Sequence, residues 1–294
     1  MSSPLTLQNG ALRCELKPAL GGCIAGLWWG DEPVLQSTPA AQLESVRQAA
    51  CYPLLPYSNR MANAVLHWQG QTYPLLKNWQ PDPHSIHGVG WVRAWSVLEA
   101  TSQSATQTYQ HAGDAAWPFA FDATQTFSLV DQRLAMTMSM TNRARQEVPV
   151  GLGWHPFFVK RPGAQLHFEA RARWEMGPDQ LPTQRLPSAG LQTEVGALVV
   201  DHCFDGWSGQ AVLRDSMFTI KVHSDLPHLV VYTLPQRSDI AIEPVSHSNN
   251  AFNRYADGEY DAASLGVKTL GPGQSFACTM AITVQPTLQK TATP

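Results

Sequence analysis

Charged residues are scarce in this sequence. They make up 15% of the 294 residues, against about 25% in a typical soluble domain. The formal net charge is −3 without a basic cluster, so the positive surface that nucleic acids and anionic membranes attract is missing. Long apolar runs are missing too, because the stretch 229–234 is far shorter than the roughly 20 residues that span a bilayer. We therefore expect no nucleic-acid or membrane partner and favour a small, nearly neutral ligand.

Cysteine is also sparse. The five cysteines are odd in number, widely spaced and without a CxxC pair, so a disulfide framework is not indicated. The first 20 residues lack the basic and apolar regions of a signal peptide. No Asn-x-Ser/Thr acceptor site occurs either. These absences predict reduced thiols and a cytoplasmic protein.

Glycine and proline, in contrast, are abundant, with 21 and 22 residues, and they favour many short strands separated by turns. The clearest pattern runs from Phe119 to Asn142, where apolar residues alternate before and after Asp131-Gln132. This pattern predicts a hairpin with one buried face. Residues 275–284 alternate in the same way. Further strands are predicted at 11–18, 64–68, 94–100, 211–214, 218–223, 229–234 and 239–243.

Helices are expected only in short pieces, within 41–51 and parts of 191–201. Successive strands with few helices predict a mainly β protein, a large antiparallel β-sandwich, rather than alternating βα units. No linker or repeat divides the chain, so we expect one domain over 1–294, with 286–294 as a loose tail. A monomer and a homodimer are both compatible with the sequence.

Two residues are candidates for proton transfer. His155 lies between aromatic residues and is followed by Pro156, and Glu243 ends an alternating segment before Pro244. Histidine titrates close to neutral pH and can donate and accept a proton at low cost. A carboxylate that serves the same reaction would complete an acid-base pair. Taken singly, His155 could equally be a core histidine, and Glu243 could be a strand-end partner of an arginine.

Other polar and aromatic residues are candidates for binding. Asn59-Arg60 could hold hydroxyl groups in a fixed geometry, and Asp201 could accept hydrogen bonds from paired hydroxyls. An ion pair for Arg60 and a turn cap for Asp201 are the structural alternatives. Trp91 and Trp154 adjoin the candidate histidines and could stack on an apolar ligand face.

Several other chemistries are disfavoured. His84 and His87 lie close together, yet no third ligand stands at a zinc-like spacing. The two Gly-x-Gly pairs lack the third glycine of a nucleotide loop, and no Gly-x-Ser-x-Gly elbow occurs. We therefore expect no metal and no cofactor.

Read together, these segments resemble the aldose 1-epimerase (galactose mutarotase-like) family over about residues 50–255. In that family an Asn-Arg, a His-Gly, a His-Pro-aromatic and a late Glu-Pro segment occur in this order. Here they are Asn59-Arg60, His87-Gly88, His155-Pro156-Phe157 and Glu243-Pro244.

The resemblance implies a galactose mutarotase-like supersandwich and an isomerase that interconverts the α and β anomers of a free aldose. It implies His155 as general acid, Glu243 as general base, and Arg60, His87 and Asp201 as sugar-binding residues. A sugar-binding protein without activity is the alternative from another class, and a glycoside hydrolase is less favoured because such enzymes usually use two carboxylates. An acidic hexose would need convergent basic residues, for which Arg60, Arg93 and Arg161 are candidates.

Overall fold

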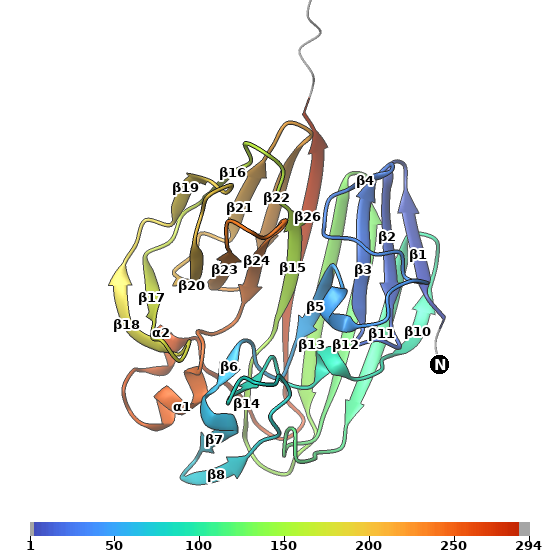
Figure 1. Ribbon diagram of the computed structural model, residues 1–294. Helices are drawn as coiled ribbons and strands as arrows, with labels where there is room; N and C mark the ends of the chain where they lie inside the picture. Colours follow the sequence, from blue (N-terminus) through green and yellow to red (C-terminus); the bar gives the residue numbers. More distant parts are fainter. Residues whose placement is uncertain (1–2, 288–294) are drawn as a thin grey trace, which may run out of the picture.

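Two large antiparallel sheets form the body of the protein, which the computed structural model describes over residues 3–287 (Figure 1). The first sheet has 11 strands, and β4 (Glu32–Pro33) joins it beside β3. Its other strands follow the order β1 (Leu5–Asn9), β2 (Leu12–Lys17), β3 (Cys23–Trp29), β5 (Cys51–Leu54), β15 (Gly153–Val159), β24 (Asp239–Val245), β23 (His228–Thr233), β20 (Val200–Asp205), β17 (Ala172–Met176) and β18 (Pro182–Pro187).

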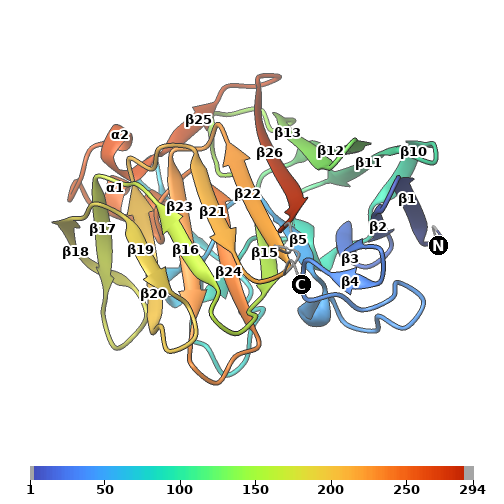
Figure 2. The same cartoon turned by 90° about the horizontal axis from the view of Figure 1, so that it is seen from above.

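The second sheet has 9 strands and packs against the first, as the view from above shows (Figure 2). Its order is β10 (Ser96–Ala100), β11 (Ser104–His111), β12 (Phe121–Val130), β13 (Arg133–Asn142), β26 (Ser275–Pro286), β22 (Phe218–Ser224), β21 (Gln210–Arg214), β16 (Gln165–Phe168) and β19 (Leu191–Glu194). One hydrophobic core contains buried side chains from both sheets. The prediction of a large antiparallel β-sandwich is confirmed.

The hairpin predicted from alternation is formed by β12 and β13. Val130 pairs with Arg133 across the two-residue turn Asp131-Gln132. Phe127 and Met138 are buried, because every second side chain of a strand points to the same face. The predicted late strand is β26, and the other seven predicted strands also form, each with bounds within two residues of the expected ones.

One of the two predicted helical segments is wrong. Residues 41–51 contain the short 3₁₀ helix η1 (Val46–Gln48), as expected, whereas 191–201 contain β19 and the start of β20 instead of a helix. Leu191–Glu194 pairs with β16, so tertiary pairing decides its conformation. The α-helices among the described residues are instead α1 (Ala251–Ala256) and α2 (Ala262–Leu265). Neither is long or apolar enough to cross a membrane.

The last strand extends further than the sequence predicts. β26 runs to Pro286, which pairs with Phe218, so the predicted tail does not begin at 286. The rest of that tail, 288–294, lies outside the described residues. All five cysteines are buried free thiols.

Short ribbons and turns support the loops on the outer side of the first sheet. His247 Nε2 accepts from the Ser58 amide at 3.1 Å, and Asn250 Oδ1 accepts from the Ala62 amide at 3.1 Å. The segment after β24 therefore fixes the loop that carries Asn59 and Arg60. These ribbons pair β6 (Arg60–Met61) with β9 (Ser85–Ile86), β7 (Val65–Trp68) with β8 (Gln71–Pro74), and β14 (Val148–Val150) with β25 (Lys268–Leu270), and the turns are η2 (Ala62–Ala64) and η3 (Gly90–Val92).

The alternation of β13 gives a direct test of the core. Met138→Ala removes a fully buried side chain and is expected to lower the free energy of unfolding by about 2–5 kcal/mol. Thr137→Ala, on the exposed face of the same strand, should change it by no more than about 0.5 kcal/mol. Urea denaturation of both variants measures the difference. Equal losses would contradict the assignment of the two faces.

Candidate active site

Strand alternation separates two neighbouring residues of β15. Trp154 points into the sandwich, where its Nε1 donates to Gln125 Oε1 of the second sheet at 3.1 Å. His155 therefore points to the opposite, outer face of the first sheet. Phe157 lies two residues further along the same face, and its ring stacks on the imidazole at a centroid distance of 4.3 Å.

Glu243 reaches His155 from the neighbouring strand. The register of β15 and β24 pairs Gly153 with Val245 and Phe157 with Ala241, so that His155 stands opposite Glu243. His155 Nε2 and Glu243 Oε1 lie 3.2 Å apart. The two predicted proton-transfer residues are therefore in direct contact, side by side on one sheet face.

Both groups are buried and only partly hydrogen-bonded. His155 Nδ1 and Glu243 Oε2 have no hydrogen-bond partner among residues 3–287. Burying such atoms without partners is costly, and native structures keep few of them outside functional sites. A structural ion pair does not require such unpaired atoms, so the pair is a candidate for function.

Burial also changes the protonation of the pair. It lowers the pKa of His155 to about 3, with a further lowering by the positive charge of Arg237. It raises the pKa of Glu243 well above its usual value, and nearby Asp201 adds to this effect. These shifts favour a neutral imidazole and a protonated carboxyl group, which can share one proton.

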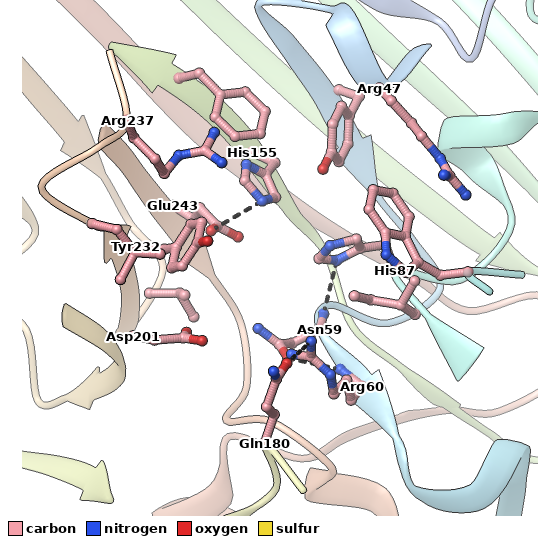
Figure 3. A pocket seen from close by; sticks show the side chains of 16 residues that line it. Arg47, Asn59, Arg60, His87, His155, Gln180, Asp201, Tyr232, Arg237 and Glu243 are labelled. Atoms are coloured by element: carbon pink, nitrogen blue, oxygen red, sulfur yellow. Dashed lines mark hydrogen bonds and ion pairs between the residues drawn. The ribbon is translucent and has the colours of Figure 1, made fainter. Parts of the chain in front are cut away.

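A cavity of about 480 Å³ opens over this pair. Figure 3 shows Glu243 directed at His155, with Asp201 on the same side and Asn59, Arg60 and Gln180 across the cavity. Asp201 belongs to β20, where it pairs with Tyr232 of β23. Six predicted residues line this single cavity, namely Asn59, Arg60, His87, His155, Asp201 and Glu243.

His87 and Asn59 hold each other in place. The Asn59 amide donates to His87 Nδ1 at 3.1 Å, and the His87 amide donates to the Asn59 carbonyl at 2.9 Å. Because Nδ1 accepts a hydrogen bond, a neutral His87 carries its proton on Nε2. Burial lowers the pKa of His87 well below its usual value, so this neutral form persists. His87 can thus donate one hydrogen bond to a ligand.

The backbone at this point is constrained. Asn59 and His87 both have positive φ, 56° and 62°, which few residues with a side chain adopt. Gly88 also has positive φ, and a Cβ there would lie 2.3 Å from the Leu55 carbonyl oxygen. Strained positions of this kind persist only where surrounding contacts enforce them, and they are common at ligand sites.

Arg60 is held by two partners. Its Nε donates to Asp82 Oδ2 at 2.9 Å, and its Nη2 donates to Gln180 of the β17–β18 turn. His84, considered above as a metal ligand, has both ring nitrogens in contact with the backbone, at Asn63 N and Asp179 O. His84 is therefore a structural residue of this wall.

The two predicted tryptophans do not line the cavity. Trp154 is buried in the core, because neighbouring side chains of a strand point to opposite faces and His155 points to the cavity. Trp91 is buried behind Tyr52 and His87, at ring-centroid distances of 5.3 and 6.0 Å. The aromatic wall of the cavity comes instead from Trp79, with Tyr52, Phe157 and Tyr232.

The basic residues considered for an acidic ligand also differ. Arg93 pairs with Asp114, and Arg161 pairs with Asp215, both away from the cavity. Sequence reasoning missed Arg47 and Arg237, which line the cavity from loops without a recognisable motif. It also missed the cavity-lining residues Tyr52, Trp79, Phe157, Gln180 and Tyr232. Only Phe157 could have been found from the sequence, because residues two apart in a strand point to the same face, and Phe157 is two residues after His155.

The fold and site define a β-sandwich protein with a buried histidine–glutamate pair in a cavity lined by polar and aromatic side chains. The family model of aldose 1-epimerase matches residues 4–265. The chain therefore belongs to the aldose 1-epimerase family.

Individual proteins are similar to this chain in sequence or in fold. The uncharacterised protein YphB of Escherichia coli K12 is 27% identical, and the match covers 95% of this chain and 98% of YphB. A crystal structure from Escherichia coli K12, provisionally described as an aldose 1-epimerase, superposes with a TM-score of 0.86 at 24% identity, covering 97% and 99% of the two chains. The GalM/aldose epimerase homologue from C. elegans has a TM-score of 0.80 at 16% identity and 97% and 99% coverage.

The lowered pKa of His155 can be measured directly. Because burial disfavours the imidazolium, we expect the ring of His155 to stay neutral at pH 5. Long-range ¹H–¹⁵N NMR spectra, with the signal assigned by its loss in His155→Asn, record the titration. A ring that protonates near pH 6.5, the value of a free histidine, would contradict this assignment.

Proposed function

We propose that this protein is a mutarotase, which interconverts the α and β anomers of a free aldose through ring opening. The observation that carries the proposal is the direct contact between the buried imidazole of His155 and the buried carboxyl of Glu243. Membership of the aldose 1-epimerase family supports it.

The reaction suits two groups that lie side by side. Ring opening moves one proton from the anomeric hydroxyl and delivers one to the ring oxygen, and both oxygens are bonded to C1. The acid and the base therefore have to reach neighbouring atoms. A spacing of 3.2 Å between His155 Nε2 and Glu243 Oε1 is compatible with this requirement.

Glu243 removes the proton of the anomeric hydroxyl while His155 protonates the ring oxygen, and the bond between C1 and the ring oxygen breaks. This gives the open-chain aldehyde. Rotation about the C1–C2 bond presents the other carbonyl face, and the reverse transfers close the ring as the opposite anomer.

The protonation of the resting pair is consistent with these roles. A protonated Glu243 with a neutral His155 contains as many protons as a carboxylate with an imidazolium. One proton shift along the contact between them interconverts the two forms. Each group can therefore serve in turn as donor and acceptor, as a reversible reaction requires.

The remaining polar residues of the cavity bind the sugar hydroxyls in this proposal. His87 donates from Nε2, Arg60 donates from its guanidinium, and Asp201 accepts. Asn59 positions His87 through their mutual hydrogen bonds. The cavity's aromatic wall covers the apolar C–H groups of the ring.

The catalytic assignment is tested by His155→Asn and Glu243→Gln, which keep size and polarity but remove proton transfer. Each is expected to lower kcat by about 10²- to 10⁴-fold, the usual contribution of a positioned acid or base. Polarimetry of freshly dissolved sugar measures the rate. The matched controls His167→Asn and Glu194→Gln lie on exposed positions of β16 and β19 and should keep the parent rate.

Several results would contradict the proposed mutarotase function. Catalytic-pair variants as fast as the parent would exclude the assigned roles. Sugar binding without faster anomer exchange would indicate the non-catalytic sugar-binding alternative, and release of nitrophenol from an aryl glycoside would indicate a hydrolase.

The role of Arg60 predicts a different kinetic effect. Arg60→Ala removes a charge-assisted hydrogen bond to substrate, so KM should rise about 10- to 100-fold with a smaller change in kcat. Arg60→Lys should recover part of the binding, because it keeps the charge but not the planar fork. Arg93→Ala, at an exposed ion pair outside the cavity, is the control. A fall in kcat with unchanged KM would contradict a binding role.

A cytoplasmic location also remains part of the proposal. Five buried cysteines, all free, support it, because reduced thiols are typical of that compartment.

A further inference from the structure

Two arginines line the cavity without a role in the proposed reaction. Arg47 lies in η1 on one side, and Arg237 comes from the turn between β23 and β24 on the other. Figure 3 shows them on either side of His155. Neutral hydroxyl groups do not require two further cations beside Arg60, so these residues point to a feature of the substrate.

Arg47 is a fixed cation without a carboxylate partner. Its guanidinium carbon lies 3.8 Å from the ring centroid of Trp79, close enough for a cation–π contact. None of the ion pairs within residues 3–287 includes Arg47. The stacked ring therefore restricts the side chain, while its charge stays available to a ligand.

Arg237 is oriented by a single carboxylate oxygen. Its Nε and Nη2 donate to Asp239 Oδ1 at 2.8 and 2.6 Å. Its guanidinium also lies over the rings of Tyr232 and Phe157, at 5.1 and 5.9 Å. Asp239 therefore holds the arginine in place but does not accept a hydrogen bond from Nη1.

Both arginines act on the same part of the cavity. Burial raises the pKa of Tyr52, and the positive charges of Arg237 and Arg47 both oppose this rise. Both guanidinium groups thus lie within electrostatic reach of Tyr52, whose ring packs beside that of His155 at a centroid distance of 4.8 Å. Burial raises the pKa of Asp201 and of Glu243, which favours the uncharged forms of the two carboxyl groups in the same cavity.

The position of Arg47 and Arg237 relative to the sugar follows from the proposed reaction. His155 faces the ring oxygen, and the ring oxygen is bonded to C5, which carries C6. A group on C6 therefore lies on the His155 side of the ring. Phe157 connects His155 to Arg237, since its ring contacts both side chains.

We infer that the preferred substrate is an aldose with an anionic group on C6, bound between Arg47 and Arg237. This inference rests on the proposed mutarotase function, because His155 and Glu243 fix the orientation of the ring. A carboxylate, a phosphate and a sulfonate share the required chemistry. A guanidinium binds each of them through parallel N–H donors.

The first experiment compares sugars of equal ring structure. Exchange NMR measures kcat/KM for anomer interconversion of glucose, glucuronate, glucose 6-phosphate and 6-sulfonated glucose. At least one anionic sugar should exceed glucose by about tenfold or more. This preference should shrink between 0.05 and 1 M salt, as the Debye length falls to about 3 Å, while the rate for glucose stays constant.

A matched pair of variants locates the effect. Arg47→Gln is expected to lower the ratio of kcat/KM for the preferred anionic sugar to that for glucose by about tenfold. Arg47 is exposed and has no carboxylate partner among the described residues, so its loss should not unfold the protein. Arg93→Gln removes an equal charge outside the cavity and should leave the ratio unchanged. Circular dichroism confirms the fold of both variants.

The possible results separate this inference from the proposed function. If the protein accelerates anomer exchange of glucose and prefers no anionic sugar, the inference of an anionic substrate is wrong, while the proposed mutarotase function is kept. An unchanged ratio in Arg47→Gln would likewise overturn the inference. If saturation-transfer NMR detects salt-sensitive binding of an anionic sugar, but no sugar exchanges its anomers faster, the anion site stands and the mutarotase is wrong.

Discussion

The contact between His155 and Glu243 is the interaction on which the site depends. An isolated carboxylate or imidazolium inside a protein is costly, and pairing reduces that cost without removing it. Here the sheet encloses both groups, raising the pKa of one and lowering the pKa of the other. The remaining proton can be shared over 3.2 Å. A pair of this kind can donate and accept in either direction, which a charged surface ion pair in water cannot do as readily.

Strand alternation makes this contact possible in a β-sandwich. Trp154 joins the two sheets through Gln125, while its neighbour His155 faces the opposite side. The same residue-by-residue alternation therefore builds the core and the cavity from one strand. The loops around β6 and β9 add His87 and Arg60, and their strained backbone is held by reciprocal hydrogen bonds. In the proposed reaction, strands β15 and β24 thus supply proton transfer, and the loops supply part of the recognition.

The division between strands and loops bears on specificity within the aldose 1-epimerase family. The proposed reaction needs only the pair on β15 and β24, whose positions the sheet register fixes. Arg47 and Arg237 come from connecting segments, which can change without disturbing that register. Charged residues such as Arg47 and Arg237 can therefore be added to the cavity wall on these segments, while the histidine–glutamate pair stays in place.

The sequence by itself determined the features that depend on near neighbours in the chain. Alternation predicted the 119–142 hairpin, β26 and the strand that bears Glu243, and the motifs singled out His155, Arg60, His87 and Asp201. Only the tertiary structure decided that His155 and Glu243 touch, that Trp154 belongs to the core, and that Arg47 and Arg237 line the cavity. It also turned the helix expected near 191 into a strand. The physical reason is that local periodicity is set by adjacent side chains, whereas contacts between distant residues depend on strand register and loop packing.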